Sequence, residues 1–319
     1  MLYPLNEEQR MIQKTVRDLV DDQIIPLAPK VDEEMYFPVE TFEALSKLGL
    51  MGIMVDPEYG GAGQGAVTTT VVHQEIGRGC ASTALSYLAH TILCVGALRR
   101  GASHEQKLKY LPPLCTGDKL GSWGVTEPGA GSDAVSTKTF AERHGDVYVA
   151  NGQKTFITNA PYAGTFVVYM RTDKESRTHG TSSFIVEREF PGFSVGPKMN
   201  KMGMRGSPTS EIFFEDCRIP RDALLGPLNF GFMMVGKLIL GWERSCLLAP
   251  GLGGAKAAID RSARYLEERH QFGRPIGTFQ ATRHMLAQMR IDYEIARNLV
   301  YRVAWQLDRD GDPPLVDAA

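Results

Sequence analysis

The stretch Trp123–Asp133, which reads WGVTEPGAGSD, lies where the sequence changes from a helical to an extended pattern. Its glycines leave the backbone uncovered, and Thr126 and Ser132 add hydroxyl groups. Backbone N–H and side-chain O–H groups of this kind can approach an anionic or polar ligand closely. A plain turn shaped by Glu127 and Pro128 is the alternative interpretation. The stretch therefore predicts either a cofactor-binding loop or a turn at the start of a β region.

Downstream of this stretch, β-branched and aromatic residues recur in short runs. Val147–Val149 and Thr155–Ile157 flank Asn151-Gly152, a dipeptide that is typical of a two-residue hairpin turn. Further runs predict strands at 165–172, 182–187 and 211–214. Short strands at regular spacing favour a small antiparallel barrel or sandwich.

Upstream of the stretch, the pattern is helical. Asn6 is suited to cap a helix in which Ile12, Val16 and Leu19 share one face. Pro38 suits the start of a second helix, which buries Phe42 and Leu45 and ends at Gly49. Helical spacing then continues from Val71 to Leu98.

The helical pattern returns at about residue 229. Pro250 predicts a kink, and a long apolar stripe follows at Leu286, Met289, Tyr293, Ala296, Val300 and Leu307. The sequence thus predicts an α+β protein in three parts. These are an N-terminal helical domain over residues 1–120, a middle antiparallel β-barrel or sandwich over 121–228, and a C-terminal helical bundle over 229–319.

Composition excludes several classes of function. The net charge of -2 gives no general attraction for nucleic acid or for an anionic membrane. Five scattered cysteines predict reduced thiols, and the seven histidines have no spacing typical of metal ligands. The first residues contain no apolar signal segment, and we see no run of 18 apolar residues. We therefore expect a cytoplasmic protein with no metal and no membrane partner.

Four motifs together resemble the acyl-CoA dehydrogenase family. The stretch Trp123–Asp133 resembles its first signature, and three matches follow in the family's order: Asn151–Thr158, Lys201–Ser207, and Arg269–Gly273 with Gln280. The similarity covers the whole chain. It implies an FAD-dependent oxidoreductase that desaturates an acyl thioester between its α and β carbons.

The resemblance implies a set of FAD-binding residues. Thr126 would bond the isoalloxazine edge, and Ser132 would reach both the pyrophosphate and the pantetheine arm of the substrate. Phe156 and Thr158 are two residues apart on one strand and would face the flavin together; without the resemblance they would be an ordinary strand face. The full implied set is Trp123, Val125, Thr126, Gly131, Ser132, Phe156, Ile157, Thr158, Arg269, Phe272 and Gln280.

Three members of that set imply an oligomer. In the family, the residues that match Arg269, Phe272 and Gln280 come from a neighbouring subunit and close over the ADP half of FAD. This implies a homodimer or homotetramer. The alternative is that Arg269 is a helix-end arginine favoured by the helix dipole.

The reaction needs a base for the α-proton, and a carboxylate in a dry site suits the task. The stretch Gly241–Ala249 resembles the helix that carries this base in the isovaleryl- and long-chain enzymes, and Glu243 matches the base itself. Arg244 would be structural or a weak contact for the polar arm of the substrate. A solvated Glu243–Arg244 surface pair is the alternative.

Several alternatives stay open. The thioester could be carried by coenzyme A or by an acyl-carrier protein, and electrons could pass to an electron-transfer flavoprotein or a similar acceptor. An oxygen-using acyl-CoA oxidase or flavin monooxygenase would share the fold. The sequence stops at Asp317–Ala319, a stretch that resembles the opening of another helix, and members of the family normally continue with further helices. We therefore expect the end of the helical domain to be missing. A non-catalytic binding or assembly protein is therefore the third hypothesis.

Overall fold

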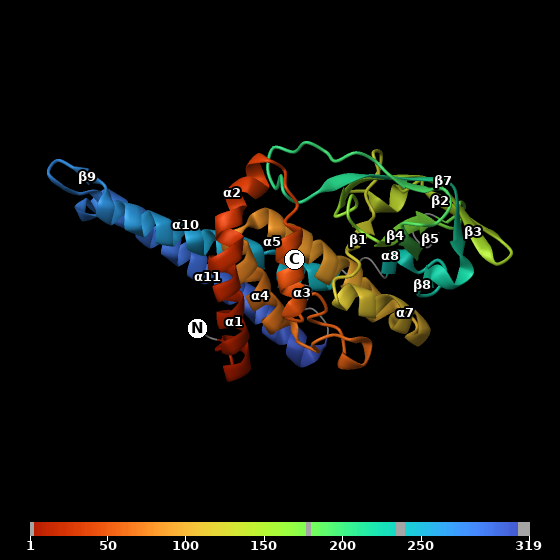
Figure 1. The fold of residues 1–319 in the computed structure, drawn as a ribbon, viewed down its shortest axis with the longest axis horizontal. Helices are drawn as coiled ribbons and strands as arrows, with labels where there is room; N and C mark the ends of the chain where they lie inside the picture. Colours follow the sequence, from red (N-terminus) through yellow and green to blue (C-terminus); the bar gives the residue numbers. More distant parts are fainter. Residues whose placement is uncertain (1–2, 177–179, 234–239, 312–319) are drawn as a thin grey trace. The chain divides into compact units, whose positions relative to one another are not determined.

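The computed structural model describes residues 3–176, 180–233 and 240–311 (Figure 1). The chain groups into two compact units. The first, here called the helical unit, comprises residues 1–29, 65–84 and 244–319. The second, here called the β unit, comprises residues 30–64 and 85–243. Each unit draws on separated stretches of the chain. The three domain boundaries given above remain a prediction.

The helical unit is built mainly from four helices. They are α1 (Glu7–Leu19), α4 (Ala66–Gly79), α10 (Ala249–Glu268) and α11 (Gln280–Asp310). The π-helical turn η1 (Val20–Ile24) follows α1, and α10 and α11 are joined by the short strands β9 (His270–Gln271) and β10 (Arg274–Pro275) and the turn η7 (Ile276–Thr278). Helices α2 (Ile25–Glu33), α5 (Ala81–Leu88) and α9 (Leu240–Leu247) run across the boundary between the units.

Local signals position the first helix as expected. The Asn6 side chain accepts a hydrogen bond from the Gln9 backbone N–H at 2.8 Å, and the Gln9 side chain accepts one from the Asn6 N–H at 3.0 Å. This reciprocal capping box satisfies two amides at the helix start. Val16 and Leu19 are buried, so the predicted cap and apolar face are confirmed.

A buried carboxylate connects α1 to α4. The Glu75 side chain is 2% exposed and accepts hydrogen bonds from Arg17 at 2.7 Å and from Gln13 at 2.8 Å, both on α1. Arg78, one turn further along α4, donates to the same carboxylate at 3.2 Å. A buried charge needs such partners because an uncompensated one is costly.

Two glycines allow α4 and α10 to cross at backbone distance. A Cβ at Gly253 of α10 would lie 2.0 Å from the Gln74 carbonyl oxygen, and one at Gly77 of α4 would lie 2.4 Å from the backbone of Pro250. Neither position has room for a side chain. The crossing of α4 and α10 therefore depends on the absence of two side chains.

The helix around Pro250 differs from the expectation. Helix α9 ends at Leu247, and Pro250 lies in the first turn of a new helix, α10. The predicted kink is thus wrong and is replaced by a break, since proline tolerates the first turn of a helix but not its interior. On α11, Tyr293, Val300 and Leu307 are buried as expected, whereas Ala296 is exposed.

The β unit contains a sheet of eight strands in the order β6-β7-β3-β2-β4-β5-β8, with β1 paired to β4. The strands are β1 (Gly121–Gly124), β2 (Phe140–His144), β3 (Val147–Thr158), β4 (Thr165–Arg171), β5 (Thr181–Glu187), β6 (Phe193–Val195), β7 (Thr209–Pro220) and β8 (Leu224–Leu225). Most pairings are antiparallel, as expected, but β4 pairs in parallel with both β1 and β2.

Helices complete the β unit. They are α3 (Val39–Lys47), the π-helical η3 (Ala89–Val95), α6 (Gly96–Gly101), α7 (His104–Cys115) and α8 (Gly231–Met233), with single 3₁₀ turns η2 (Pro57–Tyr59), η4 (Ala134–Ser136) and η5 (Arg221–Ala223). Phe42 and Leu45 of α3 are buried as predicted. The core of the unit includes Phe166, Phe184 and Phe214 from β4, β5 and β7.

The hairpin predicted at Asn151-Gly152 is wrong. Both residues lie inside the single long strand β3, and the chain turns instead at Gly145-Asp146, between β2 and β3. A register shift at Gly152 marks a bulge in its pairing with β7. Gly152 is required there because a Cβ would lie 2.7 Å from the Thr139 Cα, while the Asn151 side chain exchanges hydrogen bonds with Asp216 on β7.

One helical stretch among the described residues, Ala81–Gly101, is long and apolar enough to cross a membrane. The search for 18 consecutive apolar residues overlooked this stretch because uncharged polar residues, such as Ser86 and Thr91, interrupt it. In the structure, 78% of its most apolar window is buried inside the protein. Burial of this kind is typical of a core helix.

The helix crossing yields a first prediction. Gly253→Ala should destabilise the protein by about 1–3 kcal/mol, because the new methyl group would overlap the backbone of α4. Gly251→Ala is the matched control: it lies on the same helix with open space around it, and alanine favours a helix over glycine by up to about 1 kcal/mol. Urea unfolding of both variants measures the difference. Equal stability of the two would contradict the close crossing.

Candidate functional site

The end of β1 and the end of β3 lie side by side in the β unit. The Thr155 N–H donates to the Thr126 carbonyl at 2.8 Å, and the Ser122 hydroxyl donates to the Thr158 carbonyl at 2.6 Å. Sequence reasoning placed these two segments on one cofactor but gave no reason for them to meet. The structure joins them by one backbone hydrogen bond and by one hydrogen bond from a side-chain hydroxyl.

Beyond β1, the chain forms a tight turn and then an open loop. Glu127 and Ala130 exchange two backbone hydrogen bonds, of 3.0 and 3.1 Å, and close the turn over Pro128 and Gly129. Residues 131–133 are exposed, and a Cβ at Gly131 would meet no atom within 4 Å. Trp123, Val125 and Thr126 are half-buried. The predicted cofactor loop therefore presents uncovered backbone and hydroxyl groups.

A bulge changes the geometry predicted for Phe156. Its φ is +58°, and the pairing of β3 with β7 shifts register between Lys154 and Ile157. The bulge interrupts the regular alternation between Lys154 and Ile157. Phe156 is 66% exposed, Ile157 is buried and Thr158 is half-buried, so the shared face of Phe156 and Thr158 stays a prediction. A left-handed backbone is unfavourable for a large side chain, and such strain is concentrated at functional sites.

A buried carboxylate fastens both ends of the loop. The Glu127 carboxylate accepts hydrogen bonds from the backbone N–H of Lys138 at 2.7 Å and of Thr139 at 2.9 Å, and from the Thr137 hydroxyl. Glu127 begins the loop and residues 137–139 end it. One side chain thus holds the two ends of the loop together.

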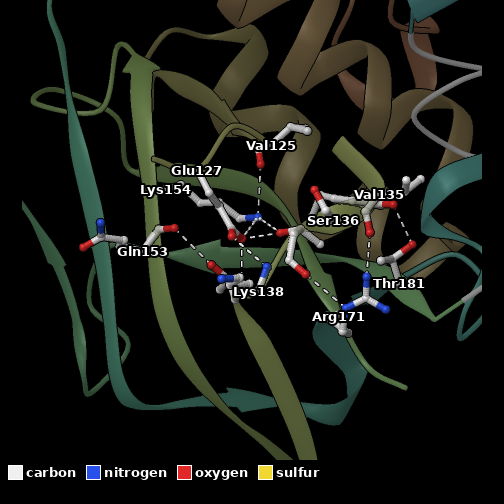
Figure 2. Close-up of polar contacts among 12 residues, drawn as sticks. Val125, Glu127, Val135, Ser136, Lys138, Gln153, Lys154, Arg171 and Thr181 are labelled. Atoms are coloured by element: carbon white, nitrogen blue, oxygen red, sulfur yellow. Dashed lines mark hydrogen bonds and ion pairs between the residues drawn. The ribbon is translucent and has the colours of Figure 1, made fainter. Parts of the chain in front are cut away.

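The same carboxylate pairs with a buried ammonium from β3. The Lys154 side chain is fully buried, and its Nζ lies 2.8 Å from the Glu127 carboxylate, 2.8 Å from the Thr137 hydroxyl and 3.1 Å from the Val125 carbonyl (Figure 2). All three partners accept hydrogen bonds from the ammonium. Removing one partner of a buried ion pair typically costs about 3–5 kcal/mol.

Arg171 holds the far side of the loop. Its guanidinium donates to the carbonyls of Val135 at 2.6 Å and Thr137 at 3.0 Å, as Figure 2 shows, and also to the Ser176 carbonyl at 2.7 Å. The planar fork of an arginine suits several carbonyls at once. No sequence pattern indicated Arg171, and Lys154 was noted only as a member of the motif Asn151–Thr158.

The pKa values of the ion pair reflect these contacts. Burial alone would raise the pKa of the Glu127 carboxyl, but the charge of Lys154 and the hydrogen bonds from Lys154, Thr137 and Thr139 lower it to about 2. Burial lowers the pKa of the Lys154 ammonium to about 8, against the opposing effect of the Glu127 carboxylate. Both groups are therefore charged near neutral pH.

The remaining predicted cofactor residues lie in the helical unit. Arg269 caps the C-terminal end of α10, Phe272 lies in the connection between β9 and β10, and Gln280 begins α11. All three are exposed, and the ring of Phe272 is 91% exposed with a φ of +53°. An aromatic ring held outward in this way is typical of a contact site.

The predicted base and its neighbour lie on α9. The backbone of Glu243 is helical, as the sequence predicted, but its side chain lies outside the described part of the structure. Arg244 is exposed. The geometry of proton abstraction thus stays a prediction.

A cavity of about 360 Å³ in the helical unit is a separate feature. Its lining includes Glu75, Arg17, Arg78, Arg290 and Arg297, and contains none of the predicted cofactor or substrate residues. Within the described ranges, the histidines, cysteines and carboxylates form no group of three that could hold a metal ion.

The β unit fits the group that the motifs imply. A flavin needs an apolar ring to lie against and hydrogen-bond donors at its edge and phosphates. The exposed ring of Phe156 provides the first, and the open backbone of residues 128–133, with the Thr126 and Ser132 hydroxyls, provides the second. Isoalloxazine-contacting residues would come from Trp123–Thr126 and Phe156–Thr158.

Family models match nearly the whole chain. The acyl-CoA dehydrogenase N-terminal domain matches residues 6–118, the middle domain matches 122–217, and the C-terminal domain matches 229–319. The short-chain specific acyl-CoA dehydrogenase of Clostridium acetobutylicum is 40% identical over 319 residues, which are all of this chain and 84% of the relative. The mitochondrial isovaleryl-CoA dehydrogenase of Solanum tuberosum is 40% identical over 95% of this chain and 74% of its own.

Solved structures agree with the family models. Butyryl-CoA dehydrogenase from Megasphaera elsdenii superposes with a TM-score of 0.96 at 34% identity, over 100% of this chain and 84% of its own. A chain from work on the electron transferring flavoprotein of Acidaminococcus fermentans has a TM-score of 0.96 at 36% identity, over 100% of this chain and 83% of that chain. A prolyl acyl carrier protein oxidase has a TM-score of 0.94 at 32% identity, over 99% of this chain and 83% of that chain.

The three domain models in sequence order and the 40% identity along the whole chain lead to one assignment. This chain belongs to the acyl-CoA dehydrogenase family of FAD-dependent oxidoreductases.

Proposed function

We propose that this chain oxidises the Cα–Cβ bond of a short acyl-CoA, with Glu243 as the base that removes the α-proton. The observation that supports flavin binding is the hydrogen-bonded pair of segments Trp123–Thr126 and Thr155–Thr158. Thr126, which precedes the loop, bonds to Thr155, which precedes the exposed Phe156. Relatives named for short-chain, isovaleryl and butyryl substrates support the short acyl chain.

The chain's own residues have three tasks in this reaction. The loop 128–133 and the hydroxyls of Thr126 and Ser132 bind and orient the cofactor, and the apolar ring of Phe156 excludes water from one side. FAD, when bound, supplies the acceptor for the β-hydride. Ser132 has the further proposed task of contacting the pantetheine arm of the thioester.

The α-proton beside a thioester is weakly acidic, so a positioned base is needed on the face opposite to the hydride acceptor. Glu243 is proposed for this task because Gly241–Ala249 resembles the base-bearing helix of the isovaleryl enzyme, and α9 is helical there. Arg244, which is exposed, is proposed as a weak contact for the polar part of the substrate.

Electron-transfer flavoprotein is the proposed acceptor, and the similarity to a chain from the Acidaminococcus fermentans work supports this choice. The second candidate function is an oxidase that passes the electrons to oxygen and takes its acyl group from an acyl-carrier protein. One observation favours it, the TM-score of 0.94 with a prolyl acyl carrier protein oxidase.

A homodimer or homotetramer is proposed, in which Arg269, Phe272 and Gln280 close over the FAD of a neighbouring subunit. The outward ring of Phe272 supports this arrangement. A cytoplasmic location is proposed because all five cysteines are free and buried, as expected in a reducing compartment.

The test of the function is the visible absorption of the FAD-loaded protein during anaerobic addition of straight and branched acyl-CoAs. Butyryl- or isovaleryl-CoA should bleach the flavin band more completely than long-chain acyl-CoAs. Reoxidation by electron-transfer flavoprotein, with little hydrogen peroxide released in air, should follow. Bleaching by an acyl-carrier-protein thioester alone, with peroxide released, would favour the oxidase. Failure to bind FAD would favour a non-catalytic relative.

The proposed base is tested by Glu243→Gln. This variant should bind FAD normally but reduce it at least about a thousandfold more slowly with substrate, because an amide does not accept the α-proton. Glu267→Gln, which changes an exposed carboxylate on α10, is the control and should reduce the flavin at the unaltered rate. Stopped-flow absorbance measures both rates. Rapid flavin reduction by the Glu243 variant would assign the base to another residue.

A further inference from the structure

We propose that Glu127 and Lys154 act as positioning residues for the flavin, since their buried ion pair fixes the loop 128–136 against the end of β3. The identity of the bound molecule as FAD rests on the proposed function. The effect of the ion pair on the loop does not depend on the proposed function, because this effect involves only contacts within the β unit. Neither side chain is proposed to touch the substrate or to take a proton.

The pair connects every segment of the proposed flavin site in this unit. Lys154 precedes Thr155 and Phe156 on β3, and its ammonium also holds the Val125 carbonyl, next to Thr126, at 3.1 Å. Glu127 opens the loop and accepts hydrogen bonds from Lys138 and Thr139, where the loop returns to the sheet. Displacing either charge would therefore move both groups of flavin-contacting residues.

The loop has a few anchors of its own: Ala130 is buried, and Ser136 donates to the Asp133 carbonyl at 2.8 Å. Pro128, Gly129 and residues 131–133 are exposed, so apolar packing fixes little of their backbone. Arg171 anchors the far side at Val135 and Thr137, but no bond of this arginine reaches the turn at Glu127. The positions of the amides that face the ligand are thus set by polar contacts at the two ends of the loop.

The pair is held by charge as well as by hydrogen bonds. The Lys154 charge and the hydrogen bonds from Lys154, Thr137 and Thr139 favour the ionised form of Glu127 and, against the effect of burial, lower its pKa to about 2. Loss of one partner would leave the other charge uncompensated in a dry site, whereas loss of both would not. This asymmetry distinguishes an ion pair from two residues that merely fill space.

The test compares Lys154→Met, Glu127→Gln and the double variant. In the protein without FAD, each single variant should raise the amide exchange rates of residues 127–139 at least about tenfold, because the loop opens more often. FAD added to these proteins should bind about tenfold to a hundredfold more weakly in each single variant. The double variant should recover part of both losses. The position of the visible band of bound flavin should shift in the single variants.

Two further variants keep the test decisive if a single charge loss prevents folding. Thr137→Val retains both charges and removes only the hydroxyl between them, so a smaller loss of FAD affinity, about threefold, is expected. Lys109→Met is the matched control. It breaks an ion pair of similar length in the same unit, 2.9 Å to Glu187, whose lysine is mostly exposed. It should leave FAD affinity and loop exchange unchanged.

Three outcomes separate the positioning role from the proposed function. Unchanged exchange of residues 127–139 in Lys154→Met and Thr137→Val would overturn the positioning role, whether or not FAD binds. Faster exchange in a protein whose wild type binds no FAD would support the hold on the loop while refuting the flavin function. Equal loss of FAD affinity in Lys154→Met and Lys109→Met would show that the Glu127–Lys154 pair contributes only to general stability and has no specific positioning role.

Discussion

The buried ammonium of Lys154 is the constraint on which the β unit depends, because a charge in the interior must be compensated where it lies. Val125, Glu127 and Thr137 are the three partners that compensate it, and they belong to the end of β1, the start of the loop and the return to the sheet. Their positions follow from that of the ammonium. The loop, which is exposed at Pro128, Gly129 and residues 131–133 and buried at Ala130, thereby gains polar anchors at both of its ends.

The helical unit follows a different principle. Gly77 and Gly253 let α4 and α10 approach at backbone distance, and the carboxylate of Glu75 holds α1 through Arg17 and Gln13. Arg269 and Phe272, at the connection between α10 and α11, are exposed.

These two arrangements explain how one fold serves related reactions. The cofactor would be held by backbone groups and hydroxyls in the β unit, whereas the base would come from α9. The identity of the acyl group then depends on side chains that neither arrangement fixes. Relatives that act on short-chain acyl-CoA, isovaleryl-CoA or a prolyl carrier protein are consistent with this division.

The sequence by itself determined the helices and strands whose signals are local, such as the Asn6 cap, the apolar faces of α1 and α3, and the strands at 165–171 and 181–187. It also determined the family, because four motifs occur in order. Tertiary structure decided what depends on partners distant in sequence. Asn151-Gly152 is a bulge rather than a turn because Asp216 on β7 and Thr139, just before β2, contact it. Lys154 is buried, against the usual preference of lysine, because Glu127, 27 residues earlier, is buried beside it. No local pattern encodes such a pair, since its free energy exists only when both charges are brought together in a dry site.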